Sequence, residues 1–121
     1  MIDPGVFDDV PQLEPLNLSS NHIETLPEMI FAQLVQLKTL DLSDNHLQSF
    51  VSELLPLNNV IEEFHIKNNE IKKTDLANLR NLKKVKIIDL TDNYCIDLKY
   101  EKGKTDAKSF PELFLALRAC M

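Results

Sequence analysis

The sequence predicts an α/β repeat solenoid: a right-handed coil with a short parallel sheet on its concave face and a capping helix at its C-terminal end. Two observations predict this fold. Four asparagines recur every 24 residues, and each stands in the same frame of apolar positions. After the fourth asparagine the chain leaves this frame and shows the start signal and apolar spacing of a helix. The chain has 121 residues, of which 44% are hydrophobic, so we expect one domain with a real core.

The repeated frame contains a short alternating segment, an asparagine and one further apolar position. In the second repeat it runs Leu37-x-x-Leu40-x-Leu42-x-x-Asn45-x-Leu47. Alternation such as Leu40-x-Leu42 is typical of a strand with one inward face. We expect the asparagine to bond the backbone of neighbouring coils, because those polar groups would otherwise be buried without partners. The asparagines are Asn21, Asn45, Asn69 and Asn93.

The frame divides the chain into a truncated first repeat, four repeats and a cap. The predicted divisions are 1–12, 13–36, 37–60, 61–84, 85–98 (a partial repeat) and 99–121.

The first residues match the back half of a repeat. Ile2, Phe7 and Val10 lie 24 positions before Leu26, Phe31 and Leu34. A solenoid normally closes its ends with atypical units, so this half repeat suggests a fragment of a longer chain. The alternative is that residues 2–10 fold back as a minimal cap. An exposed apolar end could also drive self-association.

The C-terminal segment predicts a loop followed by a helix. Tyr100 to Lys108 is polar and contains Gly103, so we expect a loop there. Ser109 and Glu112 have the spacing of a capping box. The apolar residues of the expected helix can cover the last coil, and they are Phe110, Leu113, Phe114 and Leu117.

The two cysteines can join the helix to the last coil. Cys95 takes an inward position of the frame, and Cys120 ends the expected helix. A disulfide between them would contribute about 3 kcal/mol in the chain-entropy model. Two buried free thiols are the alternative, because free cysteine is a good small core residue.

Three segments resemble extracellular leucine-rich-repeat proteins of the 24-residue type. They are Gly5-Val6-Phe7, Leu26-Pro27-Glu28-Met29-Ile30-Phe31, and Asn93-Tyr94-Cys95-Ile96 with the later Cys120. The ending is similar to the cysteine cap of secreted insect members, including those of haemolymph immunity. The resemblance implies recognition of proteins or microbial surface molecules by the concave strand face. It also implies an extracellular location, although Met1 to Pro4 do not resemble the start of a signal peptide.

The outward residues of the predicted strands and turns form a polar, mostly acidic face. We expect a partner to bind there, and the alternative is a solvated sheet face with no partner. The candidate partner-binding residues are Asn17, Thr39, Asp41, Asp44, Glu63, His65, Lys67, Asp89, Asp92 and Tyr94.

Two further motifs carry weaker signals. His22 and His46 lie one repeat apart, with Asp44 as a third candidate ligand, but two histidines without a convincing further set do not predict a metal. Asn17-Leu18-Ser19 fits the rule for a glycosylation acceptor, although the repeat itself produces such triplets by chance.

Composition excludes several classes of function. The formal net charge of −6 argues against nucleic acid as a partner. No apolar run is long enough to span a membrane. With only Gly5 and Gly103, the chain has no glycine-rich phosphate loop, and no catalytic set or cofactor motif stands out. We therefore expect a non-enzymatic binding module, with an intracellular adaptor or scaffold as the alternative.

Overall fold

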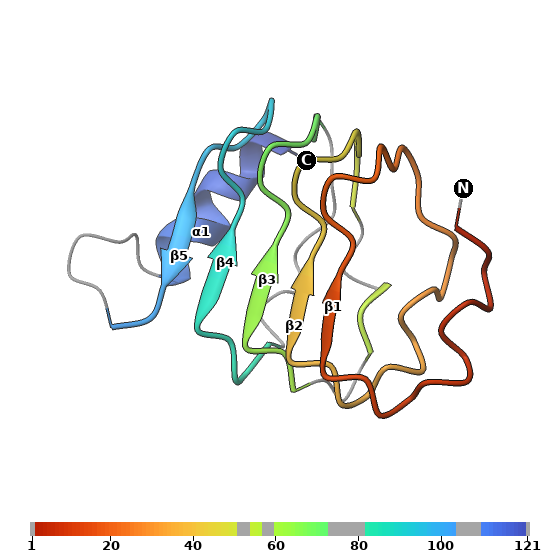
Figure 1. The fold of residues 1–121 in the computed structure, drawn as a ribbon. Helices are drawn as coiled ribbons and strands as arrows, with labels where there is room; N and C mark the ends of the chain where they lie inside the picture. Colours follow the sequence, from red (N-terminus) through yellow and green to blue (C-terminus); the bar gives the residue numbers. More distant parts are fainter. Residues whose placement is uncertain (1, 51–53, 57–59, 73–81, 104–109, 121) are drawn as a thin grey trace.

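The computed structural model describes residues 2–50, 54–56, 60–72, 82–103 and 110–120. In this part of the chain, five short strands form one sheet in sequence order (Figure 1). The strands are β1 (Pro15–Asn17), β2 (Thr39–Asp41), β3 (Glu63–His65), β4 (Ile87–Asp89) and β5 (Lys99–Glu101). The helix α1 (Phe110–Ala116) and the 3₁₀-helix η3 (Leu117–Cys120) follow them.

Strands β1 to β4 are parallel, as the repeat predicts. Their register joins equivalent positions of successive repeats: Leu16 pairs with Leu40, Leu40 with Phe64, and Phe64 with Ile88. Because alternate side chains of a strand point to opposite faces, these central residues all face the core. Leu40, Phe64 and Ile88 are fully buried.

The repeated asparagines bond neighbouring repeats together, which confirms the prediction. The Oδ1 atom of Asn45 accepts hydrogen bonds from the backbone N–H groups of Asn21 and Ile23, each at 2.9 Å. Its Nδ2 atom donates to the carbonyl oxygens of Leu18 and Leu42, each at 3.0 Å. One buried side chain therefore satisfies backbone groups of two repeats.

Strand β5 corrects the prediction of a loop over Tyr100 to Lys108. Lys99–Glu101 pairs antiparallel with β4, with Tyr100 opposite Ile88. Leu98 and Tyr100 pack against the core, whereas Lys99 is exposed. This alternation of apolar and charged residues is the signal of a strand, and it outweighs the polar composition of the segment. Of the rest of the predicted loop, 102–103 form a turn and 104–108 lie outside the described residues.

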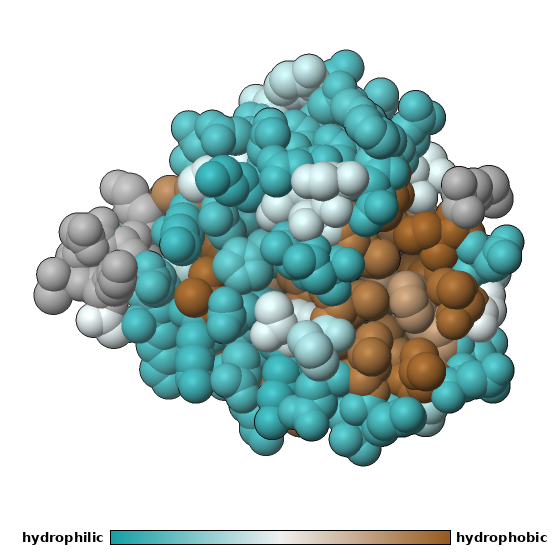
Figure 2. Space-filling view, in the orientation of Figure 1, coloured by the Kyte–Doolittle hydropathy of each residue, from teal (hydrophilic) through white to brown (hydrophobic). Residues whose placement is uncertain are grey.

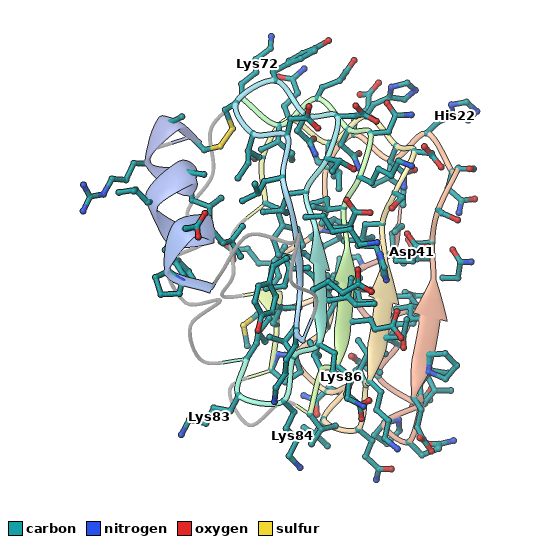
Figure 3. All side chains as sticks on the ribbon, turned by 90° about the vertical axis from the view of Figure 1, so that its left-hand side faces the viewer. His22, Asp41, Lys72, Lys83, Lys84 and Lys86 are labelled. Carbon is teal, nitrogen blue, oxygen red and sulfur yellow. A yellow bond between two sulfur atoms is a disulfide. The ribbon has the colours of Figure 1, made fainter. Side chains whose placement is uncertain are left out.

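The C-terminal helix packs against the end of the core, on the side of the sheet opposite its outward strand face (Figures 1 and 3). Leu113 is fully buried and Leu117 is 5% exposed, while Phe114 is half-buried. The structure also contains the expected disulfide between Cys95 and Cys120, whose Cα atoms lie 5.1 Å apart. The expected helix cap at Ser109 and the side chain of Phe110 lie outside the described part of the chain.

The N-terminal segment stacks under the first full repeat in the register that the sequence predicts. The rings of Phe7 and Phe31, one repeat apart, are stacked with their centroids 6.1 Å apart. Ile2 and Val10 also pack against the core, but each remains half-buried. The segment therefore extends the core without closing it completely.

Candidate functional site

The outward side chains of β1–β4 and of the turns after them form one surface, which we call the strand face. In Figure 3, Asp41 projects from the side of the sheet opposite α1. The strand pairing places the outward residues of successive repeats next to one another. The strand face comprises Pro15, Asn17, Ser19, Ser20, His22, Thr39, Asp41, Ser43, Asp44, His46, Glu63, His65, Lys67, Asn68, Glu70, Ile87, Asp89, Thr91, Asp92 and Tyr94.

Three polar residues on this face also shape the turns after their strands. The Oδ1 atom of Asp41 accepts a hydrogen bond from the backbone N–H of Ser43 at 2.9 Å. Asn17 and Asp89 make the same contact with Ser19 and Thr91, at 2.9 and 3.1 Å. Asparagine and aspartate favour such turns because their short side chains reach the backbone two residues on. The sequence analysis missed this local role, which the Asx-x-Ser/Thr spacing could have indicated.

His65 occupies the equivalent position in β3. The register places it between Asp41 and Asp89. Its Nε2 atom lies 3.1 Å from Oε1 of Glu63 on its own strand, and its side chain is 22% exposed. The centre of the strand face is therefore a histidine flanked by three carboxylates, a set that can accept hydrogen bonds from a basic partner.

The other candidate residues differ in how far they reach solvent. Asp44, Lys67 and Asp92 are exposed, whereas Thr39 and Glu63 are half-buried and Asp89 is only 9% exposed. The Oδ1 atom of Asp44 accepts a hydrogen bond from Nδ2 of Asn68 in the next repeat at 2.8 Å. Asp44 and its equivalents have left-handed backbone angles, which favour short polar residues. These positions are Ser20, Asp44, Asn68 and Asp92.

A row of rings lies along one edge of the strand face. His22 and His46 are stacked with centroids 5.5 Å apart, and their nearest ring nitrogens lie 3.3 Å from each other. Glu70 Oε1 lies 3.9 Å from Nδ1 of His46. Tyr94 is 66% exposed, with the Nζ atom of Lys72 5.5 Å above its ring. Among the described residues, no group of three or more potential ligands is placed to hold a metal ion.

The opposite ends of the strands carry an alternating charge ladder that the sequence analysis missed. Lys38 Nζ lies 3.0 Å from Glu14 Oε1, and Lys86 Nζ lies 3.1 Å from Glu62 Oε1. The hydrogen bond and charge of Glu14 raise the pKa of Lys38, to which the charge of Glu62 also contributes. Figure 3 shows Lys86 at this end of the strands, with Lys83 near it. The signal in the sequence was the alternation of charge at 24-residue intervals.

The candidate glycosylation residue, Asn17, lies on the exposed outer strand of the sheet. Its Oδ1 atom accepts hydrogen bonds from both the backbone N–H and the hydroxyl of Ser19, at 2.9 and 2.6 Å. The acceptor triplet is therefore held in a defined turn at the edge of the strand face.

Comparison with protein families finds one match to the front part of the chain. The model of the leucine-rich repeat family matches residues 1–47. No curated protein sequence matches the chain. The family match supports a leucine-rich-repeat protein, and the sheet with its C-terminal helix fits the fold of that family. None of the described helices is long and apolar enough to cross a membrane.

Proposed function

We propose that this leucine-rich-repeat chain is a non-enzymatic protein-binding module whose partner contacts the strand face. Domains of this family generally mediate protein–protein interaction, and they are typically not enzymes. Arrays of such repeats offer their concave surface to partners. We accordingly propose that the repeats form a right-handed coil with the strand face on its concave side.

The observation that carries this proposal is a polar surface left uncovered on a sheet whose other face is core. In the part of the chain that the structure describes, α1 lies on the core side and no helix covers the strand face (Figures 1 and 3). Most of the outward residues thus remain at least partly exposed, although Ser43 and Asp89 are buried, while Leu40, Phe64 and Ile88 pack into the core behind the strands. A rigid scaffold with an open polar face favours binding, because little conformational entropy is lost there on association.

The charge of the strand face favours a basic or hydroxyl-rich partner. Lys67 is its one lysine, against the carboxylates Asp41, Asp44, Glu63, Glu70, Asp89 and Asp92. Complementary charge raises the rate of association and suppresses wrong partners. Asp41, which is partly exposed, is already oriented by its turn, so it can meet a partner without first being ordered.

We further propose that the protein is extracellular and has a role in immune recognition. The disulfide between Cys95 and Cys120 supports it, because thiols of cytosolic proteins are normally kept reduced. The similarity of the ending to secreted insect repeat proteins supports the immune role. An intracellular adaptor is the alternative, and it predicts two alkylatable thiols in protein taken from its natural source. Mass measurement with and without reductant separates the two.

A quantitative pull-down tests the binding site. The strand-face variant Asp41→Asn/His65→Gln/Asp89→Asn removes charge but keeps side chains that can accept the turn hydrogen bonds, as Asn17 does. The control variant Glu28→Gln/Glu112→Gln removes the same number of carboxylates from exposed positions away from that face. Proteins retained by the wild type and the control should be lost from the strand-face variant. Equal retention by all three would place the binding site elsewhere.

A further inference from the structure

We infer that a cluster of lysines beside the beginning of β4 is a second binding surface. It takes an acidic segment of a partner protein that carries an apolar side chain among its carboxylates. This surface, which we call the lysine patch, consists of Lys83, Lys84, Lys86 and Lys102. It is separate from the strand face, and the inference does not depend on the function proposed above.

Positive charge gathers in one short stretch of an acidic chain. Residues 76–88 contain four of the 13 basic residues and no aspartate or glutamate, although the whole chain has a formal charge of −6. Lys83, Lys84 and Lys86 lie in the described part of this stretch, and all three are exposed. Figure 2 shows a mainly hydrophilic surface at the lower left, around the beginning of β4. The stretch therefore presents positive charge to solvent on a molecule whose net charge is negative.

The fold holds two of these lysines at the tip of a turn. Leu82 and Val85 are buried, and the N–H of Val85 donates a hydrogen bond to the carbonyl oxygen of Leu82 at 3.2 Å. The two residues between them are therefore turned outward. In Figure 3, Lys83 and Lys84 point away from the body of the molecule at the end where the strands begin.

Strand β5 brings a fourth lysine to the same place. Its antiparallel register with β4 sets Lys102 beside Lys86, and the N–H of Lys102 donates to the carbonyl oxygen of Lys86 at 2.8 Å. Lys102 is exposed. Three separate parts of the fold thus supply the patch: the turn before β4, the beginning of β4 and the end of β5.

Much of this charge has no partner in the part of the chain that the structure describes. Lys86 is paired with Glu62 at 3.1 Å. Among the described residues, Lys83, Lys84 and Lys102 form no ion pair with a carboxylate. Like charges held close together repel one another, so a bound anionic group is favoured here. An ammonium group has three donors and no fixed fork, which suits carboxylates on a flexible peptide.

A hollow with apolar walls adjoins the patch. It has a volume of about 360 Å³, and Lys84 is among the residues that line it. Val35 and Val60 form its apolar walls, and Val35 is 47% exposed. An apolar side chain can pack there while its acidic neighbours reach the lysines. This combination favours a peptide over a sulfated polysaccharide, which has no apolar side chain to bury.

The carboxylates at the hollow are already paired. Glu14 and Glu62 also line it, but Glu14 lies 3.0 Å from the Nζ atom of Lys38, and Glu62 lies 3.1 Å from that of Lys86. These pairs carry no net charge, so they oppose an acidic segment less than free carboxylates would. The unpaired charge of Lys84 then determines the sign of the ligand that the hollow attracts.

Other polyanions fit this surface less well. Neither the patch nor the described lining of the hollow contains an aromatic ring on which a nucleic-acid base could stack. An anionic membrane or a long nucleic acid would also meet the negative charge of the rest of the molecule. A short acidic segment can contact the lysines alone. Salt should weaken its binding, because the lysines are exposed.

Synthetic peptides test the inference with the full chain. The probe is an unstructured peptide in which glutamates flank one leucine. Two matched peptides replace the glutamates with glutamine or the leucine with serine. In calorimetry, we expect the probe to bind at least about tenfold more tightly than the glutamine peptide and about fivefold more tightly than the serine peptide. Equal affinity for the glutamine peptide would contradict the role of charge, and equal affinity for the serine peptide would contradict the apolar contact.

Matched variants locate the binding. Lys83→Gln/Lys84→Gln removes two charges from the exposed turn, and the control Lys67→Gln/Lys72→Gln removes two charges from exposed positions elsewhere. The first variant should weaken the probe by about tenfold or more, and the control by less than about twofold. Equal losses would show an effect of net charge alone. An unaltered affinity in the first variant would overturn the inference.

Two further measurements separate the peptide from other occupants. A sulfated polysaccharide and vesicles that contain phosphatidylserine should each bind more weakly than the probe. Tighter binding of either one, lost in Lys83→Gln/Lys84→Gln, would overturn the assignment of a peptide ligand. Sedimentation should show no dimer that this variant dissociates. Such a dimer would identify a second copy of the chain as the occupant and contradict the inference.

Discussion

The side chain of Asn45 accepts a hydrogen bond at 2.9 Å from the backbone N–H of Ile23, in the repeat that precedes it. Asn69 makes the same contact with Leu47 at 3.0 Å, and Asn93 with Ile71 at 3.1 Å. These bonds run between repeats, so the asparagines stabilise the stack itself and with it the strand face. Among the described residues, the side chain of Asn21 bonds only within its own repeat, to the carbonyl oxygens of Leu18 and Ser19.

This difference predicts unequal effects of the same substitution. Asn45→Ala removes the side-chain partner of five backbone groups at a site that is 4% exposed, so we expect a loss of about 3 kcal/mol or more in the free energy of unfolding. Asn21→Ala, at an exposed position, should cost about 1 kcal/mol or less. Urea denaturation of both variants measures the difference. Equal losses would show that the contacts between repeats do not hold the stack.

The disulfide predicts a redox-dependent stability. It closes a loop between residues 25 positions apart, and its loss should lower the free energy of unfolding by about 3 kcal/mol. We expect wild-type protein in reductant to unfold at the same urea concentration as Cys95→Ala/Cys120→Ala. The variant serves as the control, because reductant should not change its own midpoint. Unchanged stability of the wild type on reduction would contradict a stabilising role for the bond.

The charge ladder predicts a contribution to thermal stability that depends on the salt concentration. Lys38→Glu would place a third carboxylate between those of Glu14 and Glu62. Because these like charges repel one another, we expect a lower melting temperature. The double variant Glu14→Lys/Lys38→Glu restores one pair and should recover part of the loss. Because the groups are exposed, about 0.5 M salt should reduce the effect of the single variant. A melting temperature that does not respond to charge reversal would show that the ladder is incidental.

The raised pKa of Lys38 gives this pair a pH dependence of known sign. A lysine whose pKa is higher in the folded state contributes stability that is fully present below its unfolded pKa. The contribution is lost as the pH rises through the folded-state pKa. We therefore expect the stability difference between wild type and Lys38→Met to shrink at strongly alkaline pH. A difference that grows with pH over that range would contradict the assignment.

The parallel sheet could be predicted from the sequence because its signal repeats. Leu40, Phe64 and Ile88 occupy one frame position, and the burial of all three follows from that position. Strand β5 lies outside the frame, and a polar composition concealed the alternation of Leu98 and Tyr100. A periodic signal identifies repeats well, but it says little about the segment where the repeats end.

The strand face was only partly predictable for a different reason. Spacing alone aligned Asp41, His65 and Asp89, because a parallel sheet in register preserves the repeat. The spacing did not reveal that Asp41 bonds its own turn or that His65 contacts Glu63, since these depend on side-chain rotamers. The charge ladder was legible in the sequence, but it became meaningful only when the structure showed Glu14 within reach of Lys38.

Carboxylate footprinting of the complex with a captured partner tests the central claim most directly. Chemical labelling, followed by mass spectrometry, reports the accessibility of each aspartate and glutamate with and without the partner. Binding to the strand face predicts protection of Asp41, Asp44 and Glu63, with unchanged labelling of Glu28 and Glu112. Unchanged labelling of Asp41, Asp44 and Glu63 in the complex would contradict the claim that partners bind the strand face.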